Sequence, residues 1–394
     1  MFASRTDWRL EPNRFAAALE EHRRLGKPLL DLTNSNPTTC GFSYPEERLF
    51  AALNNRGALR YEPESQGLRH AREAIANYYR GRPGFFGAES SVDAARIVIT
   101  SGTSEAYNFV FRLLCDVGDE VLVPAPSYPL FEYLAGLADI HPVPYPLIYD
   151  RGWQIDIPGL LSALTRRSKA VMVVHPNNPT GSFIKAEEAH KLADICAGGD
   201  LAIIADEVFL DYVDGTEQPS TFASDSPVLT FTLSGLSKIS LLPQMKLGWM
   251  IVSGPAALAE PAMQRLEVIG DTYLSPSTPG QLALAEMLAM RGTLQTEMRQ
   301  RLRSNLGFLD ALFPRGSSVE RLKREGGWYA VLRVPAASSD EDLAIELLER
   351  CDVLVHPGHF FDFSRDGYLV VSLIMCEAEF QEGARRFHDF FRRA

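Results

Sequence analysis

Between residues 96 and 233 the sequence alternates short apolar segments with segments of helical character. The apolar segments contain five or six residues, are rich in β-branched and aliphatic side chains, and read RIVIT, EVLVP, AVMVV, LAIIAD and VLTFTL. Helical stretches such as KAEEAHKLADICAGG separate them. Strands that are apolar along their whole length are typical of parallel sheets with helices on both faces. The sequence therefore predicts an α/β fold with a mostly parallel sheet in a large domain.

The C-terminal part of the chain has a different pattern. After YLSPSTPG an arginine-rich helical stretch runs through RQRLRSNLGFLDALF, and short apolar segments such as GGWYAVLRV and YLVVSLI follow. A chain of 394 residues exceeds the size at which a single hydrophobic core keeps growing. We therefore expect a second, smaller α+β domain. A helix near the N-terminus is also predicted, because Asn13 can cap it and Gly26 can end it.

Composition and charge exclude several classes of protein. Hydrophobic residues make up 46% and charged residues 23% of the chain, and no apolar run approaches the length of a membrane span. Acidic residues outnumber basic residues by 50 to 39, which argues against nucleic-acid binding. The five cysteines show no C-x-x-C spacing, so we expect neither a metal site nor a disulfide framework. The start of the chain mixes acidic and basic residues without an apolar stretch, so we expect a cytoplasmic protein.

Polar residues follow four of the predicted strands. The four polar groups are Ser101-Gly102-Thr103-Ser104 after RIVIT, His175-Pro176-Asn177-Asn178 after AVMVV, Asp206-Glu207 after LAIIA, and Ser234 with Lys238 after VLTFTL. In open α/β sheets, ligands bind outside the carboxyl ends of the strands. We therefore expect these polar groups to converge on one crevice.

Each group has two interpretations when it is taken alone. The first group, Gly102, Thr103 and Ser104, can hold a phosphate through backbone N–H groups and hydroxyls at a helix start, or can simply cap the helix. Asp206 can bind a protonated ring nitrogen, or can form a salt bridge with an arginine. Taken one residue at a time, the sequence does not decide between phosphate binding and helix capping, or between a ring nitrogen and an arginine as the partner of Asp206.

The other polar and aromatic residues extend the pattern. Asn178 offers an amide to an oxygen substituent and Tyr128 offers a face for a flat ring, although either can equally be a turn or core residue. Lys238 follows an apolar run and precedes another, where the alternative is a surface lysine at a strand end. A phosphate seat, a carboxylate, an amide, an aromatic platform and one lysine together describe a site for pyridoxal phosphate. Lys238 would then form a Schiff base with the cofactor aldehyde.

At this point the chain resembles the class I/II aminotransferase family of fold-type I pyridoxal-phosphate enzymes. The resemblance covers nearly the whole chain and rests on segments that occur in the family's order: YEPESQGLRHAREAIANYY, TSGTSEA, PAPSYPLFEY, HPNNPTG, ADEVFLDY, SGLSKISLLPQMKLGW, GGWYAVL and VLVHPGHFF. HPNNPTG followed downstream by a Ser-Lys block is the strongest single match.

The resemblance implies roles for single residues and for segments. By position, Lys238 would carry the cofactor and act as base, Asp206 would bind the ring nitrogen, Asn178 would bind the phenolic oxygen, and Tyr128 would stack on the ring. Gly102, Thr103, Ser104 and Lys246 would hold the phosphate, together with Tyr61 from the neighbouring subunit of a homodimer. Residues 46–284 would form the large cofactor-binding domain, and residues 1–45 and 285–394 the small domain. Leu29–Thr38 would close over the substrate.

Four positions depart from the family pattern. Lys246 stands where the family usually has a phosphate-binding arginine, which removes the bidentate fork but keeps the charge. Gly235 replaces a phosphate-binding serine, with Ser234 or Ser237 as substitutes, and Phe209 replaces a tyrosine that donates to the ring oxygen. Val370 stands where an arginine usually binds the substrate α-carboxylate.

The resemblance implies a transaminase that moves an amino group between an amino donor and a 2-oxo acid. A β-lyase or decarboxylase would keep the cofactor and the Lys238 attachment but break another bond, and dependence of turnover on a keto acid separates these alternatives. A non-catalytic cofactor-binding sensor is disfavoured, because the chain offers no basic patch and too few residues before the first family segment for a DNA-binding module. No nucleic-acid or membrane partner is expected.

Overall fold

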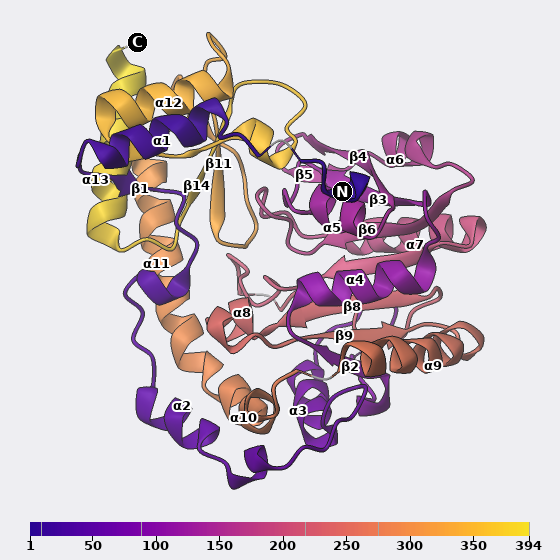
Figure 1. Ribbon diagram of the computed structural model, residues 1–394. Coiled ribbons are helices and arrows are strands. Elements are labelled where there is room, and N and C mark those ends of the chain that lie inside the picture. Colours follow the sequence, from indigo (N-terminus) through magenta and orange to yellow (C-terminus); the bar gives the residue numbers. More distant parts are fainter. Residues whose placement is uncertain (9, 88, 217, 275, 394) are drawn as a thin grey trace.

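The computed structural model describes residues 1–8, 10–87, 89–216, 218–274 and 276–393. A sheet of eight strands and a smaller sheet of four strands form two parts of the molecule (Figure 1). The long helix α11 (Arg291–Leu312) runs from one part to the other. The predicted α/β class is confirmed, with a large sheet covered by helices and a small additional sheet. No helix within the described ranges is both long and apolar enough to cross a membrane.

The large sheet is mostly parallel, as the sequence predicts. Its order is β2-β9-β8-β7-β6-β3-β4-β5. The strands are β2 (Ile97–Thr100), β3 (Glu120–Ala125), β4 (His141–Tyr149), β5 (Trp153–Ile155), β6 (Ser168–Val174), β7 (Ala202–Asp206), β8 (Thr230–Gly235) and β9 (Gly248–Ser253). Only the pairings that involve β9 and β5 are antiparallel among these strands.

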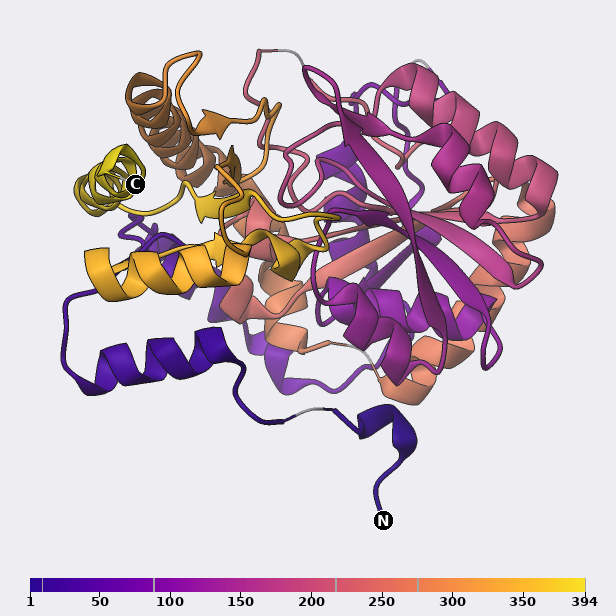
Figure 2. The same ribbon diagram turned by 90° about the horizontal axis from the view of Figure 1, so that it is seen from above.

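Helices cover both faces of the large sheet (Figure 2). Alternate residues of β6 show the two faces, because Met172 packs in one apolar cluster and Val171 and Val173 in another. The first cluster includes α4 (Thr103–Leu114), α5 (Phe131–Leu137) and α9 (Ala256–Tyr273); the opposite face meets α3 (Arg69–Tyr79), α6 (Ile157–Ala163), α7 (Ala186–Gly199) and α10 (Thr278–Ala289). Burial on both sides explains why the central strands, such as β6 and β7, are apolar along most of their length.

The small sheet has the antiparallel order β10-β11-β14-β13. The strands are β10 (Glu320–Arg321), β11 (Tyr329–Arg333), β13 (His356–Pro357) and β14 (Tyr368–Ser372), and the neighbouring helices are α1 (Arg14–Arg24), α12 (Asp340–Cys351) and α13 (Glu377–Arg393). Asn13 caps α1, since its Oδ1 accepts a hydrogen bond of 2.7 Å from the Ala16 N–H. The N-terminal helix is therefore confirmed at its predicted start.

Backbone pairing joins the N-terminal segment to the C-terminal part. Strand β1 (Leu30–Asp31) pairs in parallel with β12 (Val353–Leu354). The Ser372 N–H at the end of β14 donates to the Leu32 carbonyl at 2.7 Å. Residues far apart in the sequence thus share one local structure, while α2 (Glu46–Leu53) packs against α10 at the other end of the molecule (Figure 1).

Candidate active site

Lys238 lies on a single helical turn, α8 (Leu236–Ile239), directly after β8. The side chain is half-buried, and its Nζ is 4.7 Å from the centre of the Trp328 ring and 5.5 Å from the centre of the Phe209 ring. Burial lowers the pKa of Lys238 to about 8, while the negative charge of Asp206 acts in the opposite direction. Lys238 is therefore no surface lysine, and its amine is available in both protonation states near neutral pH.

Asp206 is buried at the end of β7. Its Oδ2 accepts a hydrogen bond of 2.8 Å from the Tyr107 hydroxyl, and its Oδ1 accepts one of 3.0 Å from the Val208 N–H. Burial raises the pKa of Asp206, and these two hydrogen bonds and Lys238 oppose that shift. Within the described ranges no arginine forms an ion pair with Asp206, so the salt-bridge alternative is not found. The carboxylate is oriented but lacks a cationic partner.

The start of α4 presents the first polar group. Helix α4 begins at Thr103 after Gly102, and no side chain caps its N-terminus. Ser104 is exposed, and Thr103 is half-buried. Because neither hydroxyl caps the helix, the simple capping interpretation does not describe this end. This helix start directly follows β2, and the N–H groups and the dipole at a helix N-terminus favour an anion.

Lys246 supplies a positive charge at the same place. Its Nζ lies 3.9 Å from the position that a Cβ on Gly102 would occupy. A Cβ on Gly248 would meet the Gly102 Cα at 2.9 Å, and a Cβ on Gly235 would meet the Gly248 Cα at 3.0 Å. These glycines let the ends of β8 and β9 approach the start of α4, so a serine at position 235 would require a backbone shift.

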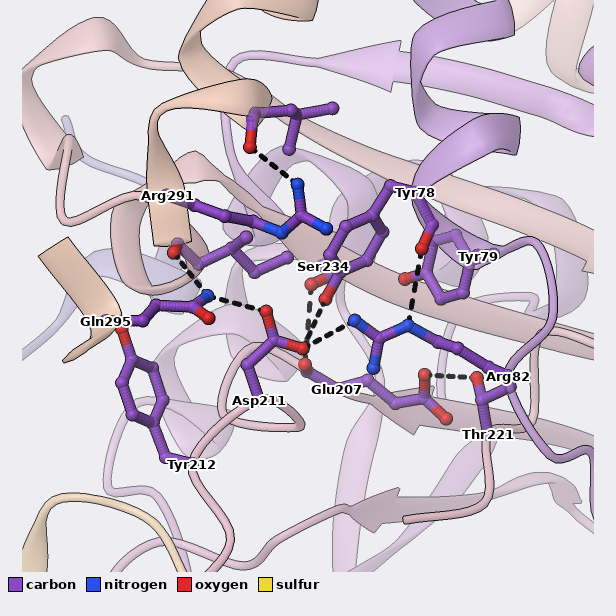
Figure 3. Close-up of polar contacts among 12 residues, drawn as sticks. Tyr78, Tyr79, Arg82, Glu207, Asp211, Tyr212, Thr221, Ser234, Arg291 and Gln295 are labelled. Carbon is purple, nitrogen blue, oxygen red and sulfur yellow. Dashed lines mark hydrogen bonds and ion pairs between the residues drawn. The ribbon is translucent and has the colours of Figure 1, made fainter. Parts of the chain in front are cut away.

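The two serines considered as substitutes lie differently. Ser234 is fully buried and its hydroxyl donates to the Glu207 carbonyl at 3.4 Å (Figure 3). Ser237 is half-buried. Ser237 is therefore the better placed of the two for a ligand oxygen.

Tyr128 and Asn178 lie on the loops after β3 and β6. Burial, Asp206 and Tyr329 together raise the pKa of Tyr128 to about 12. Asn178 is 8% exposed, and its Oδ1 has no hydrogen-bond partner among the described residues. A buried amide oxygen without a partner is uncommon in proteins. Oδ1 is an acceptor, so a contact with a ring oxygen would be made by the Nδ2 group of the same side chain.

Asn177 joins these two loops, a role that was not predicted from the sequence although Asn177 lies in one of the four polar groups. Its Oδ1 accepts from the Ser127 hydroxyl at 2.9 Å, and its Nδ2 donates to the Pro126 carbonyl at 3.0 Å and to Thr180 Oγ1 at 2.9 Å. The polar side chain therefore positions the segment that carries Tyr128 relative to the segment that carries Asn178.

Tyr61 is the one candidate that the single chain does not bring to the others. Its side chain is 76% exposed and lies just after a short 3-10 helix (Arg56–Leu59) whose last residue, Leu59, is 90% exposed. Most of the remaining candidates lie at or just after strand ends of the large sheet; these are Gly102, Thr103, Ser104, Tyr128, Asn178, Asp206 and Lys238. Lys246 lies just before the start of β9, which is antiparallel to β8, and therefore at the same edge.

A buried polar network supports the turn that carries Lys238 (Figure 3). The Tyr212 hydroxyl donates to the Lys238 carbonyl at 2.6 Å, and Gln295 Nε2 donates to the Ile239 carbonyl at 2.8 Å. The same Gln295 Nε2 donates to Asp211 Oδ2 at 2.6 Å. These side chains hold the carbonyls of Lys238 and of the residue after it, so the network fixes the backbone from which the Lys238 side chain starts.

Asp211 holds this network together. Its Oδ1 accepts from Arg82 Nη2 at 2.6 Å and from the Tyr78 hydroxyl at 2.9 Å, and both partners of the ion pair are buried. Burial pushes the pKa of Asp211 upward, but Arg82 and the hydrogen bonds from Gln295 and Tyr78 hold it below its ordinary value. The aspartate is therefore charged in the folded protein.

Replacement of Asp211 by asparagine should lower the free energy of unfolding by about 3–5 kcal/mol, because it leaves the Arg82 guanidinium buried without a counter-charge. Urea denaturation followed by circular dichroism measures the change. Glu187→Gln, which removes an exposed ion pair with Lys191, is the matched control and should change stability by less than about 1 kcal/mol. Equal effects of the two substitutions would contradict the structural role of the buried pair.

The arrangement fits a flat, phosphorylated ring with an aldehyde. It combines a helix start that favours an anion with the positive charge of Lys246, and adds a buried amide, a buried carboxylate held by hydrogen bonds, and an amine of lowered pKa. Each matches one substituent of pyridoxal 5'-phosphate, and Tyr128 offers the aromatic face.

Known proteins share both the sequence pattern and the fold. The family model for aminotransferase class I and II matches residues 30–387. The alanine aminotransferase of Mycobacterium tuberculosis is 29% identical to this chain over 92% of the chain and 78% of that protein. The glutamate–pyruvate aminotransferase AlaA of Haemophilus influenzae is 30% identical over 91% of this chain and 89% of that protein. A solved alanine aminotransferase from Pyrococcus furiosus superimposes with a TM-score of 0.89 at 23% identity and 100% coverage of both chains.

Proposed function

This chain belongs to the class I and II aminotransferase family, and we propose that Lys238 is the residue that binds its cofactor and moves the proton in catalysis. The protein is an aminotransferase that uses pyridoxal 5'-phosphate and takes an amino donor and a 2-oxo acid as substrates. When bound, this cofactor holds the substrate nitrogen at its aldehyde carbon and accepts the electron pair that the departing Cα proton leaves behind.

The observation that carries the assignment is the environment of the Lys238 amine. Nζ lies among aromatic rings, in a site where burial lowers its pKa to about 8. Burial therefore raises the neutral fraction of the amine far above that of an ordinary lysine, and the neutral amine can accept the Cα proton at Nζ and later return it. A general base with a pKa close to the working pH is the effective one.

Asp206 would keep the ring nitrogen of the cofactor protonated. The carboxylate is buried and held at both oxygens, by Tyr107 and by the Val208 N–H. A fixed negative charge in a buried site favours a proton on the group that faces it. Asn178 would donate to the ring oxygen and Tyr128 would stack on the ring, as their positions at the same edge of the sheet suggest.

The phosphate would lie at the start of α4. Gly102, Thr103 and Ser104 would contribute N–H groups and hydroxyls, and Lys246 would contribute the positive charge that an arginine supplies elsewhere in the family. A lysine contacts phosphate as a point charge without the bidentate geometry of a guanidinium.

We further propose a homodimer in which Tyr61 contacts the phosphate bound by the neighbouring subunit. The exposed fractions support an interface, since Phe50, Leu59 and Tyr61 are 64%, 90% and 76% exposed. Apolar and aromatic side chains of this size, grouped on one segment, are typical of protein contacts.

The two-domain division is likewise a proposal. A large domain of residues 46–284 would contain all eight strands of the large sheet, from Ile97 to Ser253. A small domain of residues 1–45 and 285–394 is supported by the pairing of β1 with β12. A cytoplasmic location stays a prediction from the sequence.

The substrate carboxylate has no guanidinium at the expected position. Val370 lies in the middle of β14, is fully buried, and faces Val331 on one side and His356 on the other. Arg365, on the loop before β14, donates to the Tyr368 hydroxyl at 3.1 Å and borders a cavity of about 970 Å³ that Tyr128 also lines. We propose that simple α-amino acids bind weakly unless another group replaces the missing arginine.

Assays with a panel of amino donors and two acceptors, pyruvate and 2-oxoglutarate, test the proposed function. Turnover should require both a donor and a keto acid. Donors without an α-carboxylate should reach kcat/KM values comparable to those of alanine or glutamate, because no bidentate pair, with hydrogen bonds worth about 1.5–3 kcal/mol each, favours the carboxylate at position 370. Product formation without a keto acid would instead indicate a lyase or decarboxylase, and a strong preference for α-amino acids that Arg365→Ala abolishes would assign the carboxylate to Arg365.

A further inference from the structure

The amine of Lys238 has aromatic neighbours where a buried ammonium would ordinarily need a carboxylate. The Nζ–ring distances of 4.7 Å to Trp328 and 5.5 Å to Phe209 are within the range of cation–π contacts. Within the described residues, no carboxylate approaches Nζ closely enough to form an ion pair. Asp206, from β7, acts on it only at longer range. The aromatic rings are therefore the groups that meet the amine directly.

Tight backbone packing fixes the position of Trp328. The segment before it contacts the loop after β7, where the Gly327 N–H donates to the Tyr212 carbonyl at 2.8 Å. A Cβ on Gly326 would lie 2.2 Å from the same carbonyl oxygen, so glycine is required there. On the other side, the Leu373 N–H donates to the Trp328 carbonyl at 2.8 Å. The ring is also enclosed by Phe209 and Tyr212, with centroids 5.2 Å away in both cases.

The indole N–H of Trp328 does not explain the choice of residue. Trp328 is fully buried, and its Nε1 has no hydrogen-bond partner among the described residues. A buried indole N–H usually finds a partner, and leaving it unpaired is unfavourable. Phenylalanine would fill much of the space without this cost. Tryptophan, however, offers the aromatic face with the strongest attraction for a cation.

We propose that Trp328 is a further catalytic residue of this aminotransferase, whose indole face binds the ammonium form of Lys238. The inference rests on the proposed role of Lys238 as the proton-carrying residue. Whenever Nζ holds a proton, burial disfavours the charge, and the π face of Trp328 compensates for part of the lost hydration. The ring thereby stabilises the amine in the protonated state that catalysis must pass through, and holds it close to its working position.

Other groups near Lys238 act through different contacts. Tyr212, on the segment after β7, bonds the Lys238 carbonyl and not its amine. Tyr107, from α4, bonds Asp206. Phe209 provides a second ring face, at a longer distance than Trp328. A change that alters only the electron density of the Trp328 ring therefore tests the contact between this ring and the Lys238 ammonium and leaves the other contacts in place.

Fluorinated tryptophans placed at position 328 make such a change, because each fluorine withdraws electron density from the ring face at nearly constant volume. The protein is loaded with pyridoxamine 5'-phosphate, the aminated cofactor, so that the Lys238 amine is free. Carbon NMR of lysine labelled at Cε then measures the pKa of Lys238, with its signal assigned by its absence in Lys238→Arg. We expect the pKa to fall with each added fluorine, by half a unit or more across the series, and kcat to fall in the same order.

The same fluorinated series at Trp153 is the matched control. Trp153 is also buried, its Nε1 has no hydrogen-bond partner in the described part of the chain, and no cation–π contact joins its ring to Lys238 there. The proposal would be overturned if the pKa of Lys238 stays constant or rises across the fluorinated series at position 328. It would also be overturned if the series at position 153 shifts this pKa by the same amount. Failure of the proposed function is distinguishable, because borohydride would then attach the cofactor to a lysine other than Lys238.

Discussion

Replacement of Lys238 by alanine should lower kcat by at least about 10²–10⁴-fold, the contribution typical of a positioned general acid–base. The substitution removes the amine that lies among the aromatic rings at the end of β8, and no other lysine side chain comes from that turn. Steady-state assays with the preferred donor measure the loss. Borohydride reduction of the loaded wild-type protein, followed by peptide mapping, should place the cofactor on the peptide that contains Lys238.

Lys191→Ala is the matched control for this experiment. Lys191 lies on α7 in an exposed ion pair with Glu187, so its loss should leave kcat and the borohydride label unchanged. Labelling of any lysine other than Lys238, or a Lys238→Ala enzyme with wild-type turnover, would refute the assignment. The Lys238→Ala enzyme can retain weak turnover. An increase of this turnover on addition of a small amine would agree with the assignment, because the amine replaces the missing base.

Replacement of Asp206 by alanine should lower kcat by about 10- to 100-fold, which corresponds to the loss of a charge-assisted hydrogen bond worth about 1.5–3 kcal/mol. The cofactor should still bind through the groups at the start of α4 and Lys246, which the substitution does not touch. Absorbance of the bound cofactor measures occupancy, and steady-state kinetics measure turnover. Turnover should fall much more than occupancy.

Tyr107→Phe provides the comparison for Asp206. It removes one hydrogen bond to Oδ2 but leaves the carboxylate and the Val208 N–H contact in place. Its effect on kcat should therefore be smaller than that of Asp206→Ala. A fully active Asp206→Ala enzyme would show that the ring nitrogen needs no negative charge from this residue.

The architecture of the large sheet was predictable because a strand that is buried on both faces has apolar residues at consecutive positions of the sequence. The residues of β6 that face opposite helix layers, such as Met172 and Val173, are all apolar, so the strand reads as one continuous run. Polar residues then stand out where each strand ends. Since parallel strands end at the same edge of a sheet, the meeting of Gly102, Asn178, Asp206 and Lys238 follows from strand direction.

Other residues of the site carried no local signal. Tyr107 lies 99 residues before Asp206 and reads as one of several apolar positions of α4. Gln295 lies 84 residues after Asp211, on a helix that starts beyond the large sheet. Trp328 belongs to the recognised segment GGWYAVL, but its contact with Lys238 depends on how the small sheet packs against the large one. Such pairings arise from packing between elements and have no fixed spacing along the chain.

Local pattern alone thus settles the α/β class, the strands that carry the polar groups, and the types of side chain available to a phosphorylated ring, since each follows from the burial and direction of one element. Tertiary packing decides the rest. It places Val370 in a fully buried strand beside His356, turns Ser234 toward Glu207, and leaves Tyr61 exposed. It also buries the Lys238 amine among side chains from distant segments, and this burial lowers the pKa of Lys238, while the Trp328 and Phe209 rings lie within cation–π distance of the ammonium. The pKa of a group depends on everything that surrounds it in space, and only the folded chain brings those surroundings together.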